Sequence, residues 1–122
     1  MTPDEYQIVT RLTDELPDFG DLWIKYLETA IDDEEGEKYI TLYLVATEFS
    51  KYIINLFIGY EIDKLRKAFS EVELMASNSS EYVSEVALVG FIESILVLCS
   101  HKGIPLNAFD AWLGENSKKF WY

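Results

Sequence analysis

Apolar residues recur every three or four positions along most of the chain, which is the pattern of amphipathic α-helices. The N-terminal segment Thr2-Pro3-Asp4-Glu5 combines an N-cap residue, a proline in the first turn and two acids, and so predicts a helix start. The apolar positions that follow at helical spacing are Ile8, Leu12 and Leu16. The pattern predicts a first helix that ends before Pro17 and a second helix over Asp21 to Ile31.

Two longer stretches are apolar around most of the helical circumference, which is typical of buried helices. One covers Tyr39 to Ile58 and is closed by Gly59, and the other covers Glu81 to His101 and ends at Gly103. A more amphipathic helix over Glu61 to Ser77 lies between them. We expect the two apolar helices to pack antiparallel as a central spine.

The remaining sequence predicts a short helix over Pro105 to Leu113, followed by a C-terminal segment that ends in Phe120, Trp121 and Tyr122. No long strand-like alternation and no internal repeat is present. The sequence therefore predicts an all-α fold: one domain over residues 1–122, built as an irregular bundle of five to six helices. Whether the three terminal aromatic side chains pack or stay exposed is open at this stage.

Length and composition agree with one independently folding domain. A chain of 122 residues with 49% hydrophobic residues buries about two-thirds of its extended surface on folding. Cys99 is the single cysteine, which excludes an intramolecular disulfide and indicates a reducing compartment. No signal peptide is apparent, and the most apolar run, Val86 to Cys99, is shorter than the roughly 20 residues of a membrane span. We expect a soluble, cytoplasmic protein without a membrane partner.

Negative charge is concentrated at one end of the sequence. Residues 1–37 contain twelve acids and two bases, a net charge of −10, whereas residues 38–122 contain ten acids and eight bases, a net charge of −2. Such charge would repel nucleic acid, whose binding depends on Lys and Arg, and anionic membranes. Two interpretations stay open: an ordinary solvated face, or a surface for a basic protein.

Residues that could support catalysis are few. His101 is the only histidine and Cys99 lies in an apolar run; two residues apart on a helix, they point in different directions. An EF-hand alignment on Gly36 places Ile31 and Leu42 at calcium-ligand positions, where neither side chain offers oxygen. No phosphate-binding glycine motif is present. The sequence therefore predicts a non-enzyme with no cofactor and no metal site.

Most aromatic residues have the spacing of core and core-rim positions, namely Tyr39, Tyr43, Phe49, Tyr52, Phe57 and Tyr60. Trp23 differs because it lies inside the acidic region, and interface anchors are often Trp or Tyr surrounded by charge. Trp23 is thus a candidate anchor for a partner.

A small acidic all-helical chain with concentrated carboxylates, as in Asp32 to Glu37, and no catalytic residues resembles the immunity proteins of bacterial toxin systems, of the bacteriocin and contact-dependent growth inhibition types. The resemblance is one of overall character and implies stoichiometric binding that occludes a cognate, basic, nuclease-type toxin. The residues predicted to contact the partner are Asp14, Asp18, Asp21, Trp23, Asp32, Asp33, Glu34, Glu35 and Glu37.

The alternative function is that of a non-catalytic helical adaptor or regulatory protein. It would assemble through the apolar and aromatic C-terminal segment, Ala108 to Tyr122. The sequence does not fix the oligomeric state, the identity and chemistry of a toxin, or whether a toxin would be blocked at its active site or at an exosite.

Overall fold

The computed structural model describes residues 2–31 and 41–121. Within these ranges the chain forms six helices and no β-strand. The helices are α1 (Pro3–Glu15), α2 (Pro17–Ile31), α3 (Leu42–Ile58), α4 (Ile62–Ala76), one long helix composed of α5 (Glu81–Glu85), η2 (Val86–Ile92) and α6 (Glu93–Lys102), and α7 (Glu115–Trp121). The predicted all-α bundle is confirmed.

Several helix ends lie where the sequence signals place them. Thr2 and Glu5 form a capping box on α1: the Glu5 backbone N–H donates to Thr2 Oγ1 at 3.3 Å, and the Thr2 N–H donates to Glu5 Oε1 at 3.3 Å. Ser80 caps α5 by accepting from the Val83 N–H. Gly103 ends α6 in the left-handed conformation, with φ of 68°. These ends are fixed by local chemistry alone.

The second helix begins at Pro17, four residues before the predicted start at Asp21. Proline is well suited to the first turn, because its missing N–H would have no helical partner there. Phe19 is completely buried and packs its ring edge-on against Phe49, with 5.0 Å between ring centroids. Burial of Phe19 therefore favours helical structure in a segment that the sequence pattern left outside the helix.

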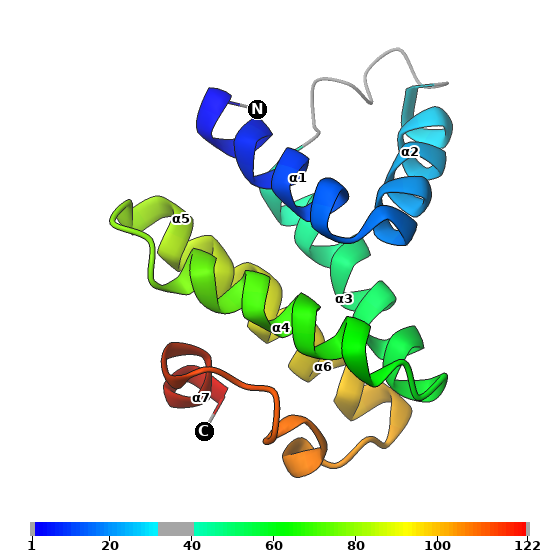
Figure 1. Ribbon diagram of the computed structural model, residues 1–122, viewed down its shortest axis with the longest axis vertical. Coiled ribbons are helices and arrows are strands. Elements are labelled where there is room, and N and C mark those ends of the chain that lie inside the picture. Colours follow the sequence, from blue (N-terminus) through cyan, green and yellow to red (C-terminus); the bar gives the residue numbers. More distant parts are fainter. Residues whose placement is uncertain (1, 32–40, 122) are drawn as a thin grey trace.

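Three central helices carry the core, and Figure 1 shows how the others cover them. α3, α4 and the α5–α6 helix lie in the middle, the α1–α2 pair covers one side, and α7 with the segment before it lies on the opposite side. The largest fully buried side chains come from all these layers and include Leu12, Phe19, Phe49, Ile53, Phe69, Phe91, Ile95 and Phe109. The core is thus one continuous cluster.

The two apolar central helices run in the same general direction, so the antiparallel prediction is wrong (Figure 1). Tyr43, in the first turn of α3, lies against Gly90, whereas Phe57, in its last turn, contacts Phe109, which follows the end of α6. The reason is connectivity: α4 follows α3 through a short turn and reverses the chain, and the next short turn reverses it again.

The middle of the long helix is π-helical over seven residues, Val86–Ile92. Gly90 lies in this segment, where an added Cβ would fall 3.2 Å from Tyr43 Cδ1. The buried Ser50 hydroxyl donates to the Ala46 carbonyl at 2.7 Å and contacts the Phe91 carbonyl at 3.4 Å. The π segment therefore lies inside the helix packing and supports the close approach of α3.

The helix predicted over Pro105 to Leu113 is reduced to a short 3-10 segment, η3 (Leu106–Phe109). The chain instead forms α7, which docks on α4 through Glu73. Both carboxylate oxygens of Glu73 accept two hydrogen bonds each from the backbone and side chains of Asn116 and Ser117, at 2.7–3.0 Å. A carboxylate from a distant helix thus supplies the N-terminal cap of α7.

The helix from Glu81 to Lys102 has 22 residues and is long and apolar enough to cross a membrane by length and composition alone. The helix extends beyond both ends of its most apolar run, Val86 to Cys99, so it reaches a length that this run alone does not. The same test is passed by the core helix of a soluble bundle, and this helix packs its buried face against α3 and α4.

Candidate functional site

The predicted partner-binding carboxylates that the structure describes lie around the corner between α1 and α2. Asp14 in the last turn of α1 and Asp21 in α2 are exposed. Neither forms an ion pair with any residue in the described ranges. Asp18 lies between them in sequence and is half-buried. The structure thus leaves two of these three carboxylates available to a partner.

An ion-pair ladder joins this corner to α4. Its three pairs run antiparallel along the facing helices: Arg11 Nε to Glu71 Oε2 at 2.6 Å, Lys67 Nζ to Glu15 Oε2 at 3.2 Å, and Lys64 Nζ to Asp18 Oδ2 at 2.9 Å. The Arg11 pair is bidentate, and its Glu71 partner is buried. Two of the acids at this corner, Glu15 and Asp18, are therefore engaged in holding α1 and α2 on α4.

The electrostatics of the ladder follow from these contacts. The hydrogen bond from Lys64 lowers the pKa of Asp18 against the opposing effect of burial, and the same bond raises the pKa of Lys64. Burial raises the pKa of Tyr52 strongly, and the nearby charge of Asp18 adds to the shift. The Tyr52 hydroxyl has no hydrogen-bond partner of good geometry in the described part of the chain. Asp18 is thus fixed as a structural carboxylate.

Trp23 does not lie on the acidic surface, and its prediction as an exposed anchor is wrong. Only 4% of its surface is exposed, and its ring stacks on Tyr26 with 5.3 Å between centroids. Its position on α2 places it on the helix face that also carries Phe19 and points into the core. Proximity to acids in sequence did not reveal which side of the helix the ring occupies.

The acidic run Asp32 to Glu37 lies outside the described residues. Its residues Asp32, Asp33, Glu34, Glu35 and Glu37 stay predicted contributors to a partner surface.

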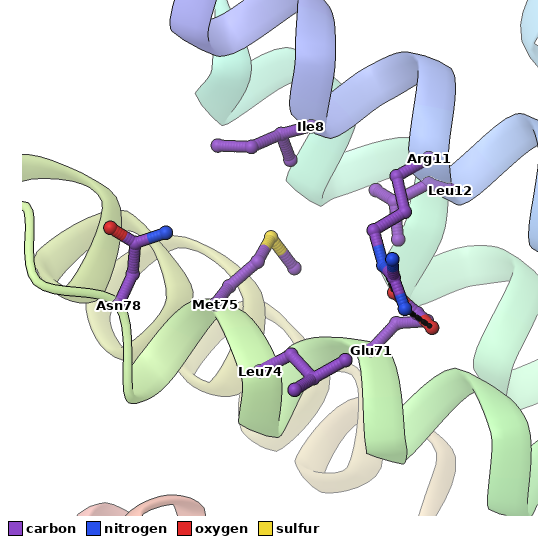
Figure 2. A pocket seen from close by; sticks show the side chains of 7 residues that line it. All are labelled: Ile8, Arg11, Leu12, Glu71, Leu74, Met75 and Asn78. Carbon is purple, nitrogen blue, oxygen red and sulfur yellow. Dashed lines mark hydrogen bonds and ion pairs between the residues drawn. The ribbon is translucent and has the colours of Figure 1, made fainter.

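A groove separates α1 from α4 and the start of α5. Figure 2 shows one part of it, a cavity of about 100 Å³ with an apolar floor; it is lined by Ile8, Arg11, Leu12, Glu71, Leu74, Met75 and Asn78. A second hollow of about 390 Å³ continues it along Asp4, Gln7, Ser79 and Ser80. The Arg11 guanidinium that borders the cavity is already bound by Glu71 (Figure 2). The cavity in Figure 2 thus has an apolar floor, and the two charged groups that border it, Arg11 and Glu71, are paired with each other.

Cys99 and His101 lie in different surroundings. Cys99 is completely buried, and burial raises the pKa of its thiol to about 11, so the thiol stays protonated at neutral pH. His101 is exposed in the last turn of α6. Among residues 2–31 and 41–121, no group of three or more His, Cys, Asp or Glu side chains could hold a metal ion.

The C-terminal aromatic segment is mostly internal. Phe109 is fully buried and contacts Phe57, Phe69 and Trp121, with ring centroids 4.9–5.8 Å apart. The Trp121 indole Nε1 donates to the Leu106 carbonyl at 2.8 Å. Phe120 is 39% exposed, and Tyr122 lies outside the described residues. Most of the surface that the adaptor alternative would need is therefore used within the fold.

A different apolar surface was missed by the sequence analysis. The turn between α3 and α4 exposes three large side chains, Ile58, Tyr60 and Ile62, which we call the Tyr60 tip. Tyr60 is 85% exposed, so the prediction that it is a core or core-rim residue is wrong, whereas Tyr43 is 41% exposed and lies against Gly90 at the rim of the core. The available signal was the position of Tyr60 immediately after Gly59, beyond the end of the helix, where periodicity no longer applies.

Fold and surface together define a small helical domain with acidic residues exposed around one corner. The chain belongs to the DUF7674 family, a domain of unknown function, whose family model matches residues 9–122. No curated protein matches the chain, and no solved structure matches it. The matched range includes the α1–α2 corner and the Tyr60 tip.

Proposed function

We propose that this domain is an immunity protein that binds a cognate, basic, nuclease-type bacterial toxin and neutralises it by stoichiometric occlusion. The observation that carries the proposal is the set of exposed carboxylates at the α1–α2 corner. Of the acids in α1 and α2, Glu5 is buried in its capping box, and Glu15 and Asp18 pair with lysines of α4. Those that stay exposed are Asp4, Asp14, Asp21 and Glu28.

These exposed acids belong to the N-terminal 37 residues, whose net charge is −10. A nuclease needs a positive cleft to hold phosphates, and that cleft is complementary to a carboxylate surface. Complementary charge raises association rates by about 10- to 1,000-fold at low salt. The charge distribution thus suits an inhibitor that must find its target quickly inside the cell that makes it.

The first experiment is a growth assay. The C-terminal domain of the gene product immediately upstream is expressed with and without this chain, and cell density is followed. Growth arrest by that domain and rescue by this chain support the proposal. A harmless upstream domain, or a toxic one that this chain does not rescue, contradicts this pairing.

The second experiment tests the surface itself with purified proteins. The variant carrying Asp14→Asn and Asp21→Asn is compared with a matched control, Glu81→Gln and Glu93→Gln, which removes two exposed charges from the α5–α6 helix. The first variant is expected to slow association with the toxin domain about tenfold at low salt, with a smaller effect at high salt. Equal effects of both variants would mean that net charge acts without a specific surface. Reversal of Asp33, Glu34 and Glu35 to Lys probes the acidic run in the same way.

A further inference from the structure

The backbone at the end of α3 has an unusual feature at Tyr60. The helix closes with a Glu61 N–H to Leu56 carbonyl bond at 3.0 Å, and Tyr60 adopts a positive φ of 56°. This is the position of a helix end where glycine is preferred, because a Cβ is disfavoured there. Gly103 takes it at the end of α6, with φ of 68°. Tyr60 is the one residue with a side chain that has positive φ in the described part of the chain.

Within residues 2–31 and 41–121, little packing of the Tyr60 ring compensates this conformation. The Tyr60 side chain is 85% exposed, and its neighbours at the tip, Ile58 and Ile62, are 59% and 37% exposed. Gly59 is immediately adjacent but has a negative φ of −85°, so a glycine is available in the turn and is not used at the left-handed position. A strained backbone that carries an exposed aromatic ring is a feature from which a function can be inferred.

Charged side chains of both signs surround the tip. Glu61 lies between Tyr60 and Ile62 and is close enough to Lys64 for its charge to act on that side chain. The Asp63 side chain is fully exposed and lies 3.9 Å from Arg66 Nη1, and Asp18 is bound to Lys64 across the helix interface. An apolar centre with a charged rim is the composition of an interface hot spot. The rim carries bases as well as acids, so the charge of the whole chain decides the partner: a net charge of −12 favours a basic protein and opposes a second copy of this acidic chain.

We propose that Tyr60 is the anchor of the partner interface and inserts its ring into an apolar pocket on a basic protein, while Glu61 and Asp63 face basic residues around that pocket. This inference rests on the proposed function and deepens it, because it supplies the aromatic anchor that the buried Trp23 cannot provide. Tyrosine suits the role, since a large ring with few rotatable bonds loses little entropy when it is bound.

The test is the substitution Tyr60→Gly, which fits the left-handed backbone and removes the ring. We expect affinity for the purified toxin domain, measured by titration calorimetry, to fall by about 30-fold or more. The melting temperature of the free chain is expected to stay the same or to rise by a few degrees. Tyr60→Phe, which keeps the ring, should bind within about fivefold of the original chain. Tyr82→Ala is the matched control, because Tyr82 is 45% exposed and lies in α5, beyond the other end of α4.

Toxin binding that is unchanged by Tyr60→Gly overturns the anchor inference and leaves the immunity proposal intact. If the original chain does not bind the toxin domain, the proposed function fails. The anchor is then tested in cells, with the photo-cross-linking residue benzoylphenylalanine placed at position 60 or at position 82 of the full chain. The anchor is supported if a basic protein is cross-linked from position 60 and not from position 82. That protein, once purified, should also bind the original chain and bind the Tyr60→Gly variant more weakly. Adducts only between copies of the chain, or none specific to position 60, overturn it.

Discussion

The contact between Glu73 and α7 gives the sharpest prediction about stability. The substitution Glu73→Gln keeps the size of the side chain but removes its charge and replaces one acceptor oxygen with a donor. Two of the four donors from Asn116 and Ser117 would then face an NH₂ group. An unsatisfied donor costs about 1–3 kcal/mol when buried. Glu73 is only partly buried, so water can satisfy part of the loss, and we expect about 1–2 kcal/mol of lost unfolding free energy at neutral pH.

The pH dependence of this loss follows from the pKa of Glu73. Burial opposes its ionisation, but the hydrogen bonds from Ser117 and Asn116 outweigh burial and lower the pKa in the folded state. A carboxyl group with a lowered folded pKa contributes stability above its unfolded pKa of about 4.3 and loses it as pH falls through the folded pKa. The difference between the original chain and Glu73→Gln should therefore be full at about pH 7 and shrink progressively below about pH 4.

Urea denaturation measured over this pH range checks the prediction. Fluorescence is a suitable signal, because Trp112 and Trp121 lie in the segment that Glu73 holds, and the midpoint should move by about 1 M at neutral pH. Glu93→Gln is the control: Glu93 is exposed, and its loss should change stability by less than about 0.5 kcal/mol. A Glu73→Gln effect that is absent at neutral pH, or equally large in acid, would refute the capping argument.

Three further substitutions test separate contacts. Gly114→Ala would place a Cβ against the Glu73 carboxylate; we expect a loss of about 1–3 kcal/mol by urea denaturation, and an unchanged midpoint would contradict the close approach. Phe49→Ala empties the centre of the aromatic core and should cost about 3–5 kcal/mol; calorimetry that shows less than about 1 kcal/mol would mean that the core is not packed as described. Arg11→Gln leaves the buried Glu71 without its cation. It should lower the melting temperature more than Lys51→Gln, which removes an ion pair on the surface. Equal decreases in melting temperature would show that burial of Glu71 does not increase the contribution of its ion pair to stability.

The candidate site was only partly visible in the sequence. The concentration of acids near the N-terminus is a property of the sequence, but exposure is not: Asp14 and Asp21 are exposed, while Asp18 is committed to Lys64, 46 residues away. Trp23 was misplaced because an aromatic residue within an acidic region can face either side of its helix. The Tyr60 tip could not be read from periodicity, since its exposure results from the turn that follows α3.

The sequence by itself determined the features that depend on neighbouring residues. The capping box at Thr2, the cap at Ser80 and the left-handed glycine at 103 each involve groups at most four residues apart. The spacing of apolar residues likewise determined the helical class of the fold, because a helix needs an apolar stripe at a fixed period to bury one face.

The tertiary structure alone decided features that depend on distant residues. Phe19 is buried against Phe49, and α2 starts at Pro17 rather than at the predicted Asp21. Glu73, on α4, supplies the N-terminal cap of α7. Two chain reversals set the direction of the α5–α6 helix relative to α3 (Figure 1). The Phe19–Phe49 and Glu73–Asn116 contacts join residues 30 or more positions apart, so the local pattern of hydrophobic and polar residues cannot contain them.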